Sequence, residues 1–285
     1  MISLANLDTS KWKPENNDNA TLYWWNEKMP VGEYWQYQRL ETAKDISPMN
    51  GYWFFAEDSL TLPLLSKPVK AKSDTLSFEL ENNYSGWNLL SNPYSWDIAI
   101  NQAEAFMDAE NAEEPAWVWN SKTNSYEPIT TLKANTAFFI HTEETRTLSI
   151  SSKPVYQEQD STKILEKAQK TFSKDSWSLR LKLMDSDEKS GDTWNVIGVG
   201  SRSLAIEKPP VGMNQKLSLA TQGNHRLLAK SIKQIGESLV WNLKLQANVS
   251  QTAKFKIEGL NKLLEQGYIA QLLIDGKTIT IDSED

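Results

Sequence analysis

The chain has 285 residues, a length that suits two or three domains better than one small core. Its net charge of −7 argues against a nucleic-acid backbone or an anionic membrane surface as the partner. The absence of cysteine excludes disulfides and thiolate chemistry. The start, MISLANLDTSKW, lacks the pattern of a signal peptide, and no apolar stretch reaches the ~20 residues of a membrane span.

The first half of the chain contains an internal repeat. Residues 61–69 (TLPLLSKPV) and 147–155 (TLSISSKPV) share their first two and last four residues, at an offset of 86. Upstream, GYWFF matches AFFIH, YWWN matches WVWN, and MIS matches LLS. The repeat predicts two small, related, antiparallel β-domains, at 1–70 and 71–155, each ending with a strand pair that closes on SKPV. Whether they fold separately or as one barrel stays open.

The second copy has an opening strand, TLSFELE, that the first copy lacks. Because the chain begins inside the counterpart of WNLLS, we expect it to belong to a longer natural protein. The variable loop of the second copy contains a segment that can form one short helix.

The last part of the chain changes character twice. Residues 156–175 are polar, with apolar residues at helical spacing, and predict a linker with a short helix. Residues 176–285 contain eight short β-prone runs, beginning with the cleanly alternating SWSLRLKLM. This spacing predicts an antiparallel β-sandwich, Ig-like or jelly-roll-like, and makes the whole chain all-β.

The motif GWNLLSNPY, followed by WVWN and by GYWFF or AFFIH, resembles a β-domain that recurs in large secreted bacterial surface proteins. DTWNVIGVGSRSLAIEKPP, LVWNLKL and YIAQLLIDGKTITI resemble a β-sandwich that often follows such repeats. The resemblance implies a secreted or cell-surface location. Members serve as spacers, adhesins and accessory modules of polysaccharide-degrading proteins, and no shared catalytic residues carry over.

Residues for catalysis are scarce. The two histidines, His141 at a strand end and His225 in a turn, belong to no metal or catalytic spacing. No G-x-S-x-G elbow occurs, and GVGS at 198–201 is better interpreted as a bulged strand. We therefore expect no enzyme activity; a glycosidase with two carboxylates is the less favoured alternative.

One acidic segment, DSDEKSGD, is a candidate cation site. Its Asp185, Asp187, Glu188 and Asp192 offer oxygen ligands of the kind calcium prefers. The EF-hand spacing is absent, and an acidic hairpin loop is the competing interpretation. Calcium is the only cofactor that these residues suggest, since two separated histidines without cysteine do not suit zinc.

Aromatic side chains are the most abundant candidate binding groups in this sequence, which contains 12 Trp. Positions aromatic in both repeat copies are predicted to be core, because both copies need them to fold. These are Tyr23, Trp25, Trp117 and Trp119, then Tyr52, Trp53, Phe138 and Phe139, with Trp35 and Tyr126. The matched pair Phe54 and Ile140, aromatic in one copy and aliphatic in the other, is predicted to be core as well. Positions aromatic in only one copy are freer to bind a ligand: Trp12, Trp24, Tyr34 and Trp96.

The sequence thus favours a non-catalytic module for attachment or display, with a polysaccharide or another surface protein as partner, besides other domains of the same parent chain. Carbohydrate binding through exposed aromatic residues is the sharper version of this hypothesis. A purely structural spacer between domains is the main alternative.

Overall fold

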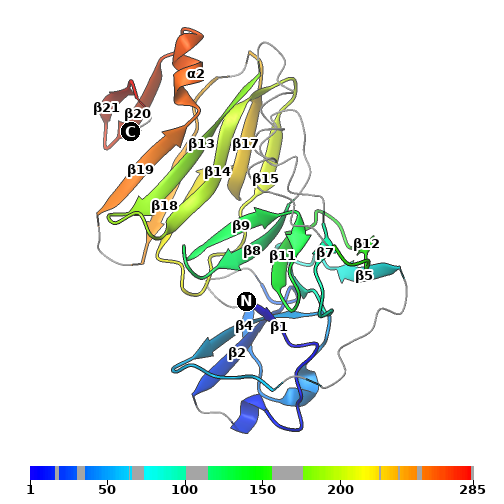
Figure 1. Cartoon of the computed structure of the whole chain (residues 1–285). Coiled ribbons are helices and arrows are strands. Elements are labelled where there is room, and N and C mark those ends of the chain that lie inside the picture. Colours follow the sequence, from blue (N-terminus) through cyan, green and yellow to red (C-terminus); the bar gives the residue numbers. More distant parts are fainter. Residues whose placement is uncertain are drawn as a thin grey trace. The chain divides into compact units, whose positions relative to one another are not determined.

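The computed structural model describes residues 1–16, 19–30, 36–63, 65, 74–100, 115–155, 176–224, 226–236, 238–248 and 252–283. Regular structure in these residues is almost entirely β-strand, which confirms the all-β prediction (Figure 1). The chain forms two compact units. The first contains the strands before residue 155 apart from the hairpin residues 120–127, and the second contains those residues and the strands from residue 177 onward. The linker and the predicted loop helix lie outside the described residues.

The strands before residue 155 form two four-stranded sheets with matching strand order. One sheet has the order β1 (Ile2–Ser3), β4 (Gly51–Ala56), β2 (Ala20–Trp25) and β3 (Tyr37–Arg39). The other has the order β6 (Trp87–Ser91), β11 (Ala137–His141), β8 (Ala116–Asn120) and β9 (Ser125–Ile129). Each strand of one sheet therefore has a counterpart at the same place in the other.

The register of the two sheets also agrees at residues matched in the sequence. Tyr23 pairs with Trp53 in the first sheet, and their counterparts Trp117 and Phe139 pair in the second. The same holds for Ile2 with Tyr52 and for Leu90 with Phe138. Because a slip of one residue turns every side chain to the other face, equal register places matched aromatic residues on matched faces.

The TLPLL and TLSIS stretches differ in structure. The second lies in β12 (Arg146–Ser151), which pairs along its length with β5 (Thr75–Leu80), the strand that only the second copy has. In the first copy residues 61–63 are not in a strand, contrary to the prediction. A strand needs a partner for its backbone N–H and C=O groups, and β5 supplies one only in the second copy.

The aromatic positions shared by both copies are buried or half-buried wherever the structure describes them. Tyr52, Trp53, Trp117, Phe138 and Phe139 are each no more than 2% exposed, which confirms their assignment to the core. Trp25 and Trp119 are half-buried and make edge-to-face contacts, Trp25 with Phe139 and Trp119 with Trp53. The two sheets of the first unit thus share aromatic packing.

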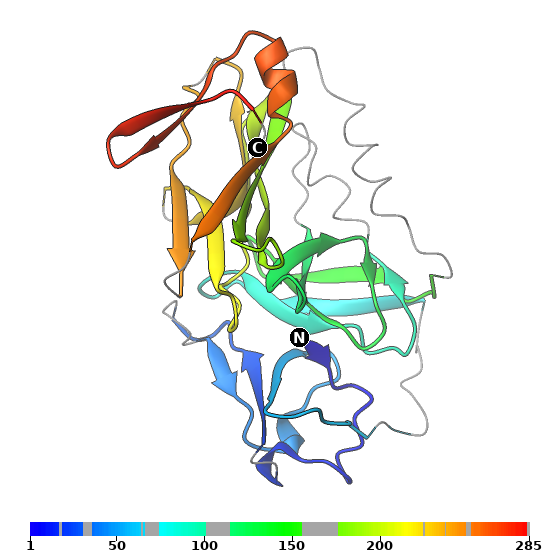
Figure 2. The same cartoon turned by 60° about the vertical axis from the view of Figure 1, so that its left-hand side comes forward.

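The second unit is built on one seven-stranded sheet. Its order is β18 (Leu243–Ala247), β16 (Leu217–Gln222), β17 (Leu227–Gln234), β14 (Gly191–Gly200), β13 (Trp177–Asp185) and β19 (Ala253–Glu258), with β15 (Leu204–Glu207) also on β17. The alternation along β13 buries Trp177, Leu179, Leu181 and Leu183, which pack in one core with residues of β16. Figure 2 shows these strands from a second side.

All eight β-prone runs of the second unit contain a strand. Two further elements were not predicted from the sequence. These are β15 and the short helix α2 (Leu260–Glu265), which follows β19 and buries Leu260 and Leu263. The last two strands, β20 (Ala270–Ile274) and β21 (Lys277–Ile281), form a separate two-stranded ribbon. The strand pairs of the seven-stranded sheet are antiparallel except β14 with β17, which is parallel, so the prediction of a purely antiparallel domain is wrong at this pair. The Ig-like or jelly-roll-like sandwich stays a prediction.

Candidate functional site

Trp12, the first predicted binding residue, is buried rather than exposed. It is 6% exposed and belongs to a core cluster with Leu4, Leu7 and Leu22. Its ring makes an edge contact with Phe54 at 6.2 Å between centroids. The polar segment around it turns the flanking lysines outward and the indole inward, so Trp12 presents no ring face to a ligand.

Trp96, another predicted binding residue, closes the core of the second repeat copy. Its ring stacks on the buried Tyr94 at 4.5 Å with an angle of 2° between the planes. Its Nε1 donates a hydrogen bond to the Ser152 carbonyl oxygen at 3.0 Å. Both the ring face and the polar atom of Trp96 are thus occupied by its own chain. Tyr34 lies outside the described residues.

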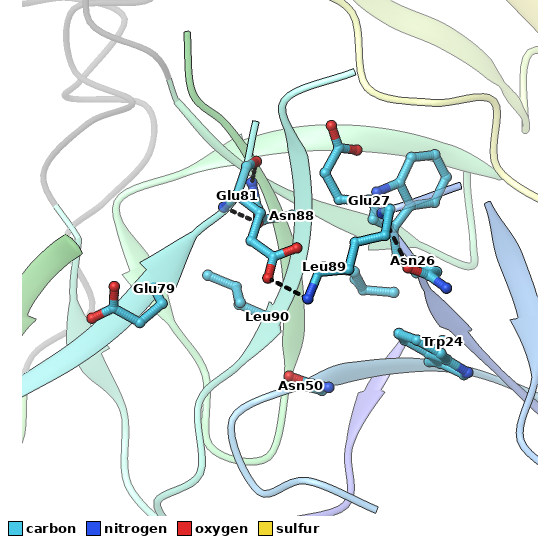
Figure 3. A pocket seen from close by; sticks show the side chains of 11 residues that line it. Trp24, Asn26, Glu27, Asn50, Glu79, Glu81, Asn88, Leu89 and Leu90 are labelled. Atoms are coloured by element: carbon cyan, nitrogen blue, oxygen red, sulfur yellow. Dashed lines mark hydrogen bonds and ion pairs between the residues drawn. The ribbon is translucent and has the colours of Figure 1, made fainter. Parts of the chain in front are cut away.

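Trp24 is the predicted binding residue that lines a pocket. It is half-buried at the end of β2 and packs on the core of the first copy. The pocket has a volume of about 190 Å³ and is lined by residues 24–28, Asn50, Glu79, Glu81 and residues 88–90 of β6. The two repeat copies therefore supply its two sides (Figure 3).

Charged and amide groups surround the aromatic wall of this pocket. The Lys28 ammonium lies 3.2 Å from the Glu81 carboxylate. Asn88 donates to the Glu81 carbonyl oxygen at 3.0 Å and accepts from its N–H at 2.9 Å, so the side chain of Asn88 is held in place. The pocket combines the indoles of Trp24 and Trp25 with a cation, carboxylates and amides, which suits a ligand bearing both apolar faces and hydroxyl groups.

The buried carboxylate of Glu27 holds the two sides of the pocket together. Its Oε1 accepts hydrogen bonds from the backbone N–H groups of Tyr84, Ser85 and Gly86, at 2.9, 2.5 and 2.6 Å. Its Oε2 accepts from the Ser85 hydroxyl at 2.6 Å and from Gln36 Nε2 at 3.3 Å. Three successive N–H groups on one oxygen form an anion-binding nest, occupied here by a side chain of the same chain.

Glu27 is not among the residues predicted from the sequence to form a site, although the sequence contains one signal for it. The nest requires Gly86, whose φ of 73° is left-handed and whose added Cβ would lie 2.3 Å from the Thr142 carbonyl oxygen. The glycine of NNYSG could therefore have indicated a special turn. In the second copy the counterpart of Glu27 is Ser121, so only the first copy has a carboxylate at this position to bind such a nest.

The four acids of the predicted cation site point to different partners. Asp185 accepts from the Ser190 hydroxyl at 2.6 Å and closes the hairpin turn, and that hydrogen bond lowers its pKa. Asp187 pairs with Lys189 at 3.0 Å. These two carboxylates serve the turn itself.

The other two acids are each bound to lysine. Glu188 accepts from Lys254 at 2.7 Å and Lys256 at 2.8 Å, and these hydrogen bonds lower its pKa to about 2. Asp192 is buried and lies 2.7 Å from Lys208. Among the described residues no group of three or more His, Asp or Glu side chains is placed to hold a metal ion.

His141 occupies a packing position. It is 1% exposed, and its ring lies 5.2 Å from that of Trp87. An added Cβ at Gly86 would meet its Nε2 at 2.8 Å, so the imidazole also fills space behind the nest. His225 lies outside the described residues.

No protein-family model, curated sequence or solved structure matches this chain. In the part that the structure describes, no helix is both long and apolar enough to cross a membrane.

Proposed function

We propose that the chain is a non-catalytic binding module of a secreted or cell-surface bacterial protein, and that it takes a sugar ring at the Trp24 pocket. The observation that carries the proposal is the placement of a half-buried indole between hydrogen-bonding side chains that are already held by other contacts. The C–H face of a sugar can cover the indole, while carboxylates and amides bind its hydroxyl groups.

The size of the pocket favours a single ring. Its volume of about 190 Å³ is below the ~300 Å³ at which pockets for drug-sized ligands begin. A terminal residue or a side branch of a glycan fits this space better than an extended stretch of polysaccharide.

The carboxylates of the pocket favour binding over hydrolysis. Glu27 accepts five hydrogen bonds, and Glu81 is paired with Lys28. Both carboxylates are occupied by groups of the chain itself, whereas a glycosidase needs one carboxyl group that is free to reach the leaving oxygen.

Affinity electrophoresis of the full chain through gels that contain plant and microbial polysaccharides, with a glycan array beside it, tests this function. We expect retardation by at least one glycan, and a loss of affinity of more than about tenfold in Trp24→Ala, since tenfold corresponds to ~1.4 kcal/mol. The matched control is Tyr268→Ala, which removes an exposed aromatic residue of the second unit. No retardation by any glycan, or equal losses in both variants, would reject the proposal.

A structural spacer is the second candidate. It is supported by Trp12 and Trp96, which were predicted to bind a ligand but pack within the protein instead. The same glycan screen separates the two candidates, because a spacer is expected to show no retardation.

A further inference from the structure

A buried cluster of three reactive side chains belongs to the second unit, whereas the residues of the Trp24 pocket belong to the first. The Lys208 ammonium nitrogen is 2.7 Å from Asp192 Oδ1 and 2.6 Å from Asn195 Oδ1. All three residues are buried, with Asp192 and Asn195 no more than 2% exposed. Asp192 and Asn195 come from β14, and Lys208 follows directly after β15.

The amide of Asn195 is oriented by its own hydrogen bonds. Its Nδ2 donates to Asp192 Oδ1 at 3.1 Å and lies 3.4 Å from the Leu181 carbonyl oxygen. The amide oxygen therefore faces Lys208, and the amide nitrogen faces Asp192. The carbonyl carbon Cγ is bonded to the oxygen that lies 2.6 Å from the lysine amine.

Asp192 is held so that one oxygen serves both nitrogens. Its Oδ2 accepts from the Leu219 N–H at 2.9 Å and lies 3.5 Å from Gln215 Nε2. Its Oδ1 contacts Lys208 Nζ and Asn195 Nδ2 together. A carboxylate within hydrogen-bonding distance of both an attacking amine and a departing amide nitrogen can carry a proton from one to the other.

Burial also favours the reactive form of the lysine. Loss of hydration lowers the pKa of Lys208, and the nearby Asp192 charge opposes this only in part. A desolvated lysine amine is a known type of activated nucleophile, and fixed proximity removes the entropy cost of bringing the groups together.

We propose that Lys208 and Asn195 are joined by an intramolecular isopeptide bond that the folded protein forms itself, with Asp192 as the proton carrier. Asp192 takes a proton from the Lys208 ammonium, and the neutral amine attacks Cγ of Asn195. A bond from Nζ to Cγ forms, and the bond from Cγ to Nδ2 breaks. The two protons that leave Nζ end on Nδ2, which departs as ammonium, so Asp192 is regenerated and no oxidant or other reactant is needed.

The bond would cross-link β14 to the segment after β15, across a separation of 13 residues. A covalent link of this kind restricts the unfolded chain in the way that a disulfide does, in a protein without cysteine. It is independent of the sugar-binding proposal, because its residues do not line the Trp24 pocket.

Mass spectrometry of the full chain tests the proposal directly. We expect an intact mass that is lower than that of the sequence by one ammonia molecule. Trypsin cleaves at Lys189, Arg202 and Lys216, while Lys208 is protected by Pro209, so Asn195 and Lys208 fall on peptides 190–202 and 203–216. We expect these two peptides to appear as one branched product. Two linear peptides at their sequence masses would overturn the proposal.

The branched product also distinguishes other routes. Ammonia lost elsewhere, for example at Asn50 before Gly51, leaves both peptides linear and counts against the bond. A branched product formed with loss of water would place the bond at Asp192 and overturn the assignment to Asn195.

Asp192→Asn tests the proton carrier, with the exposed Asp187→Asn as the matched control. We expect the branched product to disappear in the first variant and to remain in the second. Equal cross-linking in both would overturn the role of Asp192. If Asp192→Asn does not fold, Asn195→Ala and the mass of the natural chain still decide whether the bond exists.

Discussion

Two buried carboxylates, one in each unit, are stabilised in opposite ways. Glu27 in the first unit is surrounded by backbone N–H groups, a hydroxyl and an amide, without a cation among these hydrogen-bond partners. Asp192 in the second unit is paired with a lysine and an amide, and accepts one backbone N–H. Both satisfy the rule that a buried charge needs compensation, but the partners differ in chemistry.

Because of this difference, Glu27 has a structural role, whereas Asp192 lies in a cluster whose groups can react with one another. The N–H donors of the nest cannot react with the Glu27 carboxylate, so they only fix the position of the turn beside the Trp24 pocket. The amine at Asp192 can give up a proton and attack a neighbouring amide. Substitutions of partners around the two carboxylates should therefore have effects of different size and different kind.

Lys208→Met is expected to have the largest effect. It leaves Asp192 buried without a cation and removes one end of the proposed cross-link, so the free energy of unfolding should fall by about 3–5 kcal/mol. Urea unfolding followed by circular dichroism measures the change, with the exposed Lys216→Met as control. A loss below about 1 kcal/mol, the size of an ordinary substitution, would contradict the importance of this pair.

Glu27→Gln should have a smaller but local effect. The amide oxygen can still accept from the nest, but the charge is lost and the new NH₂ group faces the Gln36 donor. We expect a loss of about 1–3 kcal/mol. Hydrogen exchange of the amides of residues 84–86 should accelerate, whereas the exposed Glu57→Gln should leave them protected. If the exchange rates of these amides are unchanged in Glu27→Gln, the Glu27 carboxylate does not hold this turn in place.

Glu188→Gln supplies the exposed reference and should have the smallest effect. Hydrogen bonds from Lys254 and Lys256 lower the pKa of Glu188 from 4.5 to about 2 in the folded protein. Its contribution is therefore complete above pH 4.5 and is lost as the pH falls toward 2. Unfolding midpoints of the natural chain and the variant should converge over this interval. A difference that stays constant from pH 7 to pH 2 would exclude this ion pair as its source.

Much of the fold could be predicted from local patterns. The alternation of Trp177, Leu179, Leu181 and Leu183 predicts a half-buried strand because side chains of a strand alternate between faces. The repeated aromatic positions predict core residues in the same way. The helix α2 was missed because the pattern around Leu260 and Leu263 covers less than two turns.

The candidate site was predictable only in part. Trp24 was selected because it has no aromatic counterpart in the second copy, but the same criterion also selected Trp12, which is buried. An aromatic residue without an aromatic counterpart in the other copy is one that the shared fold does not require. The criterion does not say which way a loop residue faces, since that depends on the core that the loop covers.

The sequence by itself determined the all-β class and the strand patterns, because these follow from the period of two residues in a strand. The tertiary structure decided where the buried polar groups find partners. Glu27 meets its nest 57 to 59 residues farther along the chain, and Asp192 meets the Leu219 N–H 27 residues away. The physical reason is that a buried charge is compensated by whichever donors the folded chain places beside it, and these donors can lie far away in sequence.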